Sequence, residues 1–209
     1  MLEEYCKGKN GIGTIIFSAK SRKSDEAMLL TELAKSFPNR VILVGDGENA
    51  VLEGLAARVK AGADSEASTL LVFAGLQRLG NLRVEFQNLF SRMTLPKGSA
   101  PAASLGDSLK LILEDGSRFG IHTLVVTDSL AALDRQVPNR FNLRVGFRLT
   151  DNESHLVIGS KVAEDVDDGF ALLVDKGESS EPQEFRPYVQ IDPLWFSEQL
   201  STLKARFAP

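Results

Sequence analysis

Short apolar runs rich in β-branched residues alternate along this chain with longer segments of helical periodicity. Three of the runs, 14–18, 69–74 and 122–127, contain an unbroken stretch of at least three apolar residues, which is typical of strands buried on both faces of a parallel sheet. Their alternation with helical segments predicts a parallel sheet covered by helices. The pattern continues past the longest predicted loop, 94–101, so we predict a single α/β domain over residues 1–209.

Local sequence signals place the ends of several predicted elements. Ser24 is predicted to cap a helix whose first turn holds Asp25 and Glu26. Gly116 is predicted to cap the end of the preceding helix, and Pro193 to begin the last one, where its missing N–H costs nothing. The predicted strands are 14–18, 40–45, 69–74, 122–127, 143–149, 169–175 and 185–191, and the predicted helices are 25–37, 48–60, 83–92, 105–115 and 193–207.

Composition narrows the possible functions. The formal net charge is -4, which is not the basic balance expected of a free-standing duplex-DNA-binding protein, although a pore loop can hold DNA contacts that the total charge hides. Cys6 is the only cysteine, and His122 and His155 are the only histidines. An intrachain disulfide, a cysteine metal cluster and a multi-histidine metal centre are therefore excluded. The N-terminus lacks signal-peptide features and no apolar run approaches roughly 20 residues, so we expect a cytoplasmic protein without membrane contact by this segment.

Five phrases of this sequence, taken in order, resemble FtsK/SpoIIIE-type ATPases. The resemblance covers about residues 66–190 and implies a RecA-like, three-layer αβα fold with a mainly parallel central sheet. It also implies the C-terminal RecA-like domain of a longer protein. The first phrase, 70–78, stands at the place of the Walker B strand, and the second, 116–129, is similar to a G-x-x-x-G-I-H phrase with its strand and sensor. The third and fourth are 142–154 and 159–173. The fifth, 185–188, looks like the phrase that closes many large, multi-domain members, which include relatives of the type VII secretion ATPases.

The resemblance also implies a function and partners. Members of this family are ATP-driven motors of the P-loop superfamily, so the chain is expected to work as part of a DNA translocase or protein translocase. The expected partners are other domains or subunits of a ring-forming, oligomeric ATPase, together with DNA or a translocated protein. ATP and Mg²⁺ are expected through the parent assembly, and none for the isolated chain.

Two motifs that ATP hydrolysis requires are missing. A P-loop needs the string Gly-x-x-x-x-Gly-Lys-Ser/Thr, and the Gly- and Lys-rich segment 7–14 has its lysines before Gly11 and Gly13 and leads into a strand. A Walker B strand ends in a carboxylate that binds Mg²⁺. Here the strand 69–74 runs into Gly75, and no carboxylate follows before Glu85. We therefore predict that the chain does not hydrolyse ATP by itself, either as a fragment or as a degenerate domain.

Gln77 and Asp128 are the candidate nucleotide-binding residues, because both follow strands whose carboxyl ends carry the ligand site in open parallel sheets. Gln77 either orients a water or contacts a phosphate, or has a structural role at the strand end. Asp128 resembles the family's sensor, which responds to a γ-phosphate or a neighbouring subunit. Its alternative role is to cap the helix that follows.

Arg144 is the second catalytic candidate beside Asp128, because it matches the arginine that precedes an aliphatic-small-Phe run in the family. An arginine offered in trans to a neighbour's phosphates is a recurring device in such rings. Arg144 and Arg148 are four residues apart, which in a strand predicts that they share one face. The alternative is a solvated strand face with ion pairs to Asp151 or Glu153.

Two other classes of function compete with the motor. The first is a stand-alone regulatory or adaptor protein with a degenerate ATPase fold, which binds a partner motor or nucleic acid without turnover. The second is a metabolic enzyme on a Rossmann-like sheet, which would need a Gly-x-Gly-x-x-Gly between strand and helix, and the sequence has none.

Overall fold

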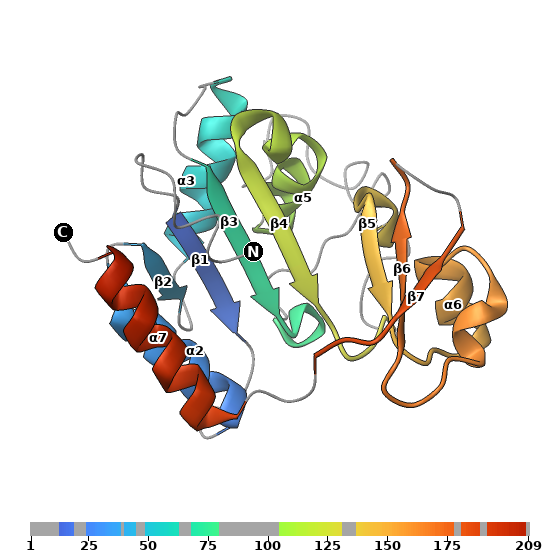
Figure 1. Ribbon diagram of the computed structural model, residues 1–209. Coiled ribbons are helices and arrows are strands. Elements are labelled where there is room, and N and C mark those ends of the chain that lie inside the picture. The colour runs from blue at the N-terminus through green and yellow to red at the C-terminus, as the bar shows by residue number, and fades with distance from the viewer. Residues whose placement is uncertain are drawn as a thin grey trace, which may run out of the picture. The chain divides into compact units, whose positions relative to one another are not determined.

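The computed structural model divides into two compact units (Figure 1). One unit spans Met1–Ser129 and Asp192–Pro209, and the other spans Leu130–Ile191. The single RecA-like domain over 1–209 stays a prediction. The segments 83–92 and 94–101 and most of 7–14 lie outside the described residues. The structure describes residues 13–18, 24–38, 40–44, 49–62, 68–79, 105–130, 137–177, 181–188 and 192–207.

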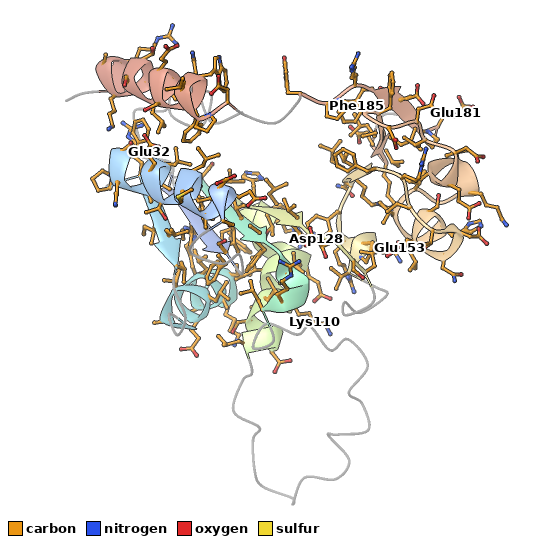
Figure 2. The ribbon with its side chains drawn as sticks, turned by 90° about the horizontal axis from the view of Figure 1, so that it is seen from below. Glu32, Lys110, Asp128, Glu153, Glu181 and Phe185 are labelled. Carbon is orange, nitrogen blue, oxygen red and sulfur yellow. The ribbon has the colours of Figure 1, made fainter. Side chains whose placement is uncertain are left out.

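The first unit is a four-stranded parallel sheet with helices on both faces. The strand order is β2-β1-β3-β4, and every neighbouring pair is parallel. Helices α2 and α7 lie on one face, and α3 and α5 lie on the other (Figures 1 and 2). This confirms the predicted α/β fold with a mainly parallel sheet. The elements are β1 (Gly13–Ser18), α2 (Asp25–Ser36), β2 (Val41–Val44), α3 (Asn49–Lys60), β3 (Thr69–Ala74), η1 (Leu76–Arg78), α5 (Leu105–Asp115), η3 (Gly116–Phe119), β4 (Ile121–Val126) and α7 (Pro193–Phe207).

Strand β3 is at the centre of the core of this unit. Leu71 and Phe73 have no exposed surface, and the Phe73 ring stacks on Phe17 of β1 with centroids 5.1 Å apart. Burying both faces of a strand removes the most apolar area from water per residue, which explains why the segment is apolar throughout. The uninterrupted apolar run therefore corresponds to a strand with neighbours on both sides.

Strand β4 departs from its prediction as a buried strand. Leu124 and Val126 are exposed, whereas Ile121 is buried. The reason is position, because among the described residues β4 pairs with β3 alone and is one of the two edge strands of this sheet. An apolar run alone does not distinguish a central strand from an edge strand.

The end of α5 departs from its prediction in a different way. The helix ends at Asp115 as expected, but the chain continues as η3, and Gly120 at φ 70° is the left-handed residue that ends the turn. Gly116 is buried, and a Cβ there would lie 3.3 Å from both the Ile112 side chain and the Ile121 carbonyl oxygen. The glycine is needed because of close packing and not because of a left-handed backbone.

The second unit is a three-stranded antiparallel sheet, in the order β5-β6-β7, with one short helix. Its core contains Ile158, Ala163, Val166, Leu172 and Val174. The last strand covers Gln183–Phe185 and so overlaps the predicted strand 185–191 only at Phe185; residues 189–191 lie outside the described residues. Pro187 has no N–H with which to continue the ladder beyond Phe185. The elements are η4 (Pro138–Arg140), β5 (Leu143–Gly146), α6 (Asp151–Val157), η5 (Lys161–Glu164), β6 (Ala171–Asp175) and β7 (Gln183–Phe185).

Candidate functional site

The carboxyl ends of three parallel strands meet at one edge of the first unit. Ser18 of β1, Ala74 of β3 and Val126 of β4 lie side by side in the strand register. In an open parallel sheet this edge is where ligands bind. The residues that follow these strands are therefore the ones to consider.

The chain turns sharply after β3. Gly75 adopts a left-handed backbone at φ 83° and donates its N–H to the Val126 carbonyl oxygen at 2.8 Å. The N–H of Arg78 then bonds to the Gly75 carbonyl oxygen at 2.9 Å and closes η1. Gln77 lies in this turn, as its position after the strand predicts, but its side chain lies outside what the structure describes.

Asp128 forms an ion pair with Arg78 across the edge. Nη2 of Arg78 donates to Oδ2 of Asp128 at 2.7 Å, and each side chain is about half exposed. Arg78 was not a predicted site residue. Arg78 is a basic residue just after β3, but the sequence does not show that β3 and β4 are neighbours. Without that knowledge, nothing in the sequence indicates that Arg78 would meet Asp128. The sensor and helix-cap roles of Asp128 both stay predictions, because residues 131–136 lie outside the described residues.

Among the described residues, the side chains at this edge do not fit a magnesium site. Mg²⁺ binds oxygen ligands, usually carboxylates and phosphates. Ala74 and Gly75 offer no side-chain oxygen at the end of β3, and the carboxylate of Asp128 is paired with a guanidinium. In the part of the chain that the structure describes, no three His, Cys, Asp or Glu side chains gather where they could hold a metal.

We expect the Arg78–Asp128 pair to be weak but measurable. A double-mutant cycle with Arg78→Ala and Asp128→Ala should give a coupling free energy of about 0.2–1 kcal/mol, because both groups are partly solvated. Urea unfolding measures it. Asp128→Ala combined with Arg118→Ala should give no coupling, since Arg118 pairs with Asp115 instead. A coupling of zero in the first cycle would mean that the ion pair does not form in solution.

Arg144 lies on β5 in the second unit and is buried, with 9% of its surface exposed. Its Nη1 donates to the carbonyl oxygens of Leu156 at 3.1 Å and Val157 at 2.9 Å, which are the last residues of α6. Burial lowers the pKa of the Arg144 guanidinium. A cation beside the carbonyls that end a helix stabilises them. These contacts support a stabilising role, and the role in trans stays a prediction.

The predicted solvated face around Arg144 is wrong. Asp151 contacts Lys161 at 3.2 Å and His155 at 3.5 Å, and Glu153 closes a capping box with Thr150, so neither carboxylate pairs with Arg144.

Arg148 does not share a strand face with Arg144. Strand β5 ends at Gly146, two residues before Arg148, so the alternation of a strand no longer applies there. Arg148 is exposed, donates Nε to the Val166 carbonyl oxygen at 3.0 Å and lies 3.5 Å from Asp168.

Among the described residues, the helices are too short or too polar for any of them to span a bilayer.

Comparison with known proteins gives a result for the structure only. No protein-family model matches the sequence, and no curated protein matches it significantly. The structure matches B204, the DNA-packaging ATPase from Sulfolobus turreted icosahedral virus, with a TM-score of 0.54 and 16% identity over 85% of this chain and 83% of that chain. It matches EssC (ATPases 2 and 3) from Geobacillus thermodenitrificans with a TM-score of 0.57 and 15% identity over 95% of this chain, which spans only 38% of that chain.

A third structure was solved with a nucleotide analogue. It is the genome-packaging NTPase B204 from Sulfolobus turreted icosahedral virus 2 in complex with ATP-gammaS, matched with a TM-score of 0.51 and 13% identity over 84% of this chain and 82% of that chain. At these identities the likeness concerns the fold. The resemblance expected from the five sequence phrases is thereby confirmed at that level, and the chain has the RecA-like α/β fold of FtsK/SpoIIIE-like ATPase domains.

Proposed function

We propose that this chain is a RecA-like domain of an FtsK/SpoIIIE-like ATPase that translocates DNA or protein, and that it does not hydrolyse ATP by itself. The observation that carries the proposal is the end of β3. A Walker B strand ends in a carboxylate that binds Mg²⁺, whereas β3 ends at Ala74, and the next residue, Gly75, donates its N–H to the Val126 carbonyl oxygen. A RecA-like fold whose described residues at this edge supply no magnesium-binding carboxylate supports a domain that does not hydrolyse ATP by itself.

Such a domain can still contribute to a motor through its surface. RecA-like rings bind nucleotide between subunits, so a domain without its own magnesium ligand is suited to complete a neighbour's site or to pass on a substrate signal. Two of the matched structures support this setting, because one is named a DNA-packaging ATPase and the other contains ATPases 2 and 3 of one chain. Asp128 and Arg78 are the groups at this edge that would respond to a neighbour.

The test is a calorimetric titration of the full chain with Mg-ATP, followed by a phosphate-release assay. We expect no heat of binding and no turnover above the buffer rate. Ala74→Asp restores a carboxylate at the end of β3 and should also remain inactive, because the chain has no P-loop string. Circular dichroism of both proteins controls for folding. Micromolar binding by the unaltered chain would overturn the proposal.

A second measurement separates the motor from the adaptor. The DNA immediately upstream of the Met1 codon is sequenced in the source genome. An in-frame strand and P-loop there support the motor domain, whereas a stop codon with a ribosome-binding site supports a stand-alone adaptor.

A further inference from the structure

Three aspartates of this sequence stand directly before a glycine, namely Asp46, Asp115 and Asp168. An aspartate before glycine cyclises more readily than one before a larger residue, because glycine places no Cβ beside the attacking backbone nitrogen. Asp46 lies outside the described residues. The other two pairs lie in opposite surroundings, so the chain contains its own comparison of how a fold affects this reaction.

Asp168 and Gly169 form the centre of an exposed β-turn just before β6. The N–H of Phe170 donates to the Asp167 carbonyl oxygen at 3.1 Å and closes the turn. Gly169 has a φ of 87°, as the third residue of a type II turn requires. The Asp168 side chain is 97% exposed, and its Oδ1 lies 3.5 Å from Nη1 of Arg148. Such a solvated ion pair restrains the side chain little.

The backbone of this turn has room to rearrange. Apart from its chain neighbours, a Cβ built on Gly169 would meet no heavy atom within 4 Å. Among the described residues, the N–H of Gly169 donates no hydrogen bond. Packing and hydrogen bonds are what hold a peptide group in place in a folded chain. Neither of them holds the Gly169 nitrogen away from the Asp168 carboxyl.

Asp115 and Gly116 are the same pair of residues in a packed setting. Asp115 is the last residue of α5, and a Cβ on Gly116 would lie 3.3 Å from both the Ile112 side chain and the Ile121 carbonyl oxygen. The Asp115 side chain is 43% exposed and lies 3.6 Å from Arg118. Ring closure has to rotate the peptide group between aspartate and glycine, and the close neighbours of Gly116 oppose that rotation.

We propose that Asp168–Gly169 is a site of spontaneous isoaspartate formation, and that the fold directs this modification to Asp168 and away from Asp115. The backbone nitrogen of Gly169 attacks the protonated side-chain carboxyl of Asp168. A carbon–nitrogen bond replaces the bond to the hydroxyl oxygen, and the hydroxyl and the amide proton leave as one water. The product is a five-membered succinimide ring.

Water then opens this ring at one of its two carbonyls. Hydrolysis at the side-chain carbonyl restores aspartate, whereas hydrolysis at the main-chain carbonyl leaves the chain running through the side chain as isoaspartate. The two steps release one water and take up one water, so no oxidant and no other co-reactant is needed. This inference does not depend on the proposed ATPase function.

The modification alters the connection into the core of the second unit. Isoaspartate adds one methylene to the main chain between Asp167 and Phe170. Phe170 packs against the core that contains Val166 and Leu172, and Ala171 is the first residue of β6. A longer turn fixes Phe170 less well, so we expect the start of β6 to be less stable in the modified chain.

The test is incubation of the purified, folded chain in neutral buffer at body temperature, followed by protease digestion. Mass spectrometry with electron-transfer fragmentation then distinguishes isoaspartate from aspartate in each peptide. We expect isoaspartate to accumulate several-fold faster at Asp168 than at Asp115, with a transient species lighter by one water in the Asp168 peptide. In guanidinium chloride, where the fold is lost, the two sites should react at similar rates. Peptide mapping keeps the products of Asn10–Gly11 and Asp46–Gly47 apart from these.

Two substitutions at one position should move the rate in opposite directions. Asp168→Asn should accelerate the modification, because an amide releases ammonia and needs no protonation of a carboxylate. Asp168→Glu keeps the charge opposite Arg148 but would have to close a six-membered ring, so it should abolish the product at this position. Asp115→Glu is the matched control and should leave the rate at Asp168 unchanged. Hydrogen exchange of 166–175 should become faster in the aged unaltered chain and not in the aged Asp168→Glu chain.

Either of two results would overturn the proposal. The first is a folded chain in which residue 168 stays aspartate over a period that modifies it in the unfolded chain. The second is an equal rate at Asp168 and Asp115 in the folded chain, which would mean that the exposed turn does not select the site.

Discussion

Replacing Arg144 by Met should lower the free energy of unfolding by about 2–3 kcal/mol, the range expected when hydrogen bonds from a buried charged group are lost. The guanidinium is the donor to the carbonyl oxygens of Leu156 and Val157 at the end of α6. Methionine fills a similar volume but donates no hydrogen bond, so both carbonyls lose this partner. Removing the charge also removes the cost of desolvating it, but we expect the loss of the hydrogen bonds to be the larger effect.

Hydrogen exchange measured by mass spectrometry should show where the effect arises. We expect faster exchange of the amides of 151–163 in the Arg144→Met protein, because α6 and the turn after it depend on this contact. Arg148→Met is the matched control, since Arg148 is exposed and makes one hydrogen bond, to the Val166 carbonyl oxygen, and it should lower the unfolding free energy by about 1 kcal/mol or less. An Arg144→Met protein as stable as the unaltered chain would contradict the stabilising role and leave the trans-acting role as the better explanation.

This prediction changes how activity data on Arg144 are interpreted. From the sequence, Arg144→Ala is expected to reduce the ATPase activity of the assembled parent while the domain stays folded. The structure adds a second cause of lost activity, namely destabilisation of α6. Only a variant that keeps the measured stability and loses activity would support an arginine that acts in trans.

Features set by nearby residues were predictable from the sequence. Ser24 caps α2 through its side chain, and its Oγ accepts the Ala27 N–H at 3.2 Å. Pro193 begins α7, and the apolar runs 14–18 and 69–74 become β1 and β3. Caps, prolines and apolar runs act within a few residues, so one sequence contains the information that decides them.

Features set by strand order were not predictable in this way. The exposure of Leu124 and Val126 follows from β4 being an edge strand, and the Arg78–Asp128 pair follows from β3 and β4 being neighbours. Gly116 is fixed by close packing against Ile112 and Ile121. These causes lie between segments distant in the sequence, so periodicity and local signals do not contain them.

The largest loss of stability is expected for Phe73→Ala, at about 3–5 kcal/mol. Phe73 has no exposed surface and stacks on Phe17 at the centre of the sheet. Truncation removes buried apolar area and leaves a cavity. The neighbouring strands β1 and β4 are held to β3 by backbone hydrogen bonds, so they cannot move in to fill it. A loss of this size is a large part of the 5–15 kcal/mol that stabilises most domains.

Urea unfolding can be followed by the emission of Trp195. This residue lies on α7, which belongs to the same unit as β3, so its emission reports the unfolding of that unit. Phe147→Ala is the control, since Phe147 is exposed, and it should change the midpoint little. Phe73→Leu should fall between the two, because leucine refills part of the cavity. If Phe73→Ala left the midpoint unchanged, β3 would not be the centre of the core. The edge that holds Gly75, Arg78 and Asp128 would then lack the rigid strand that positions it.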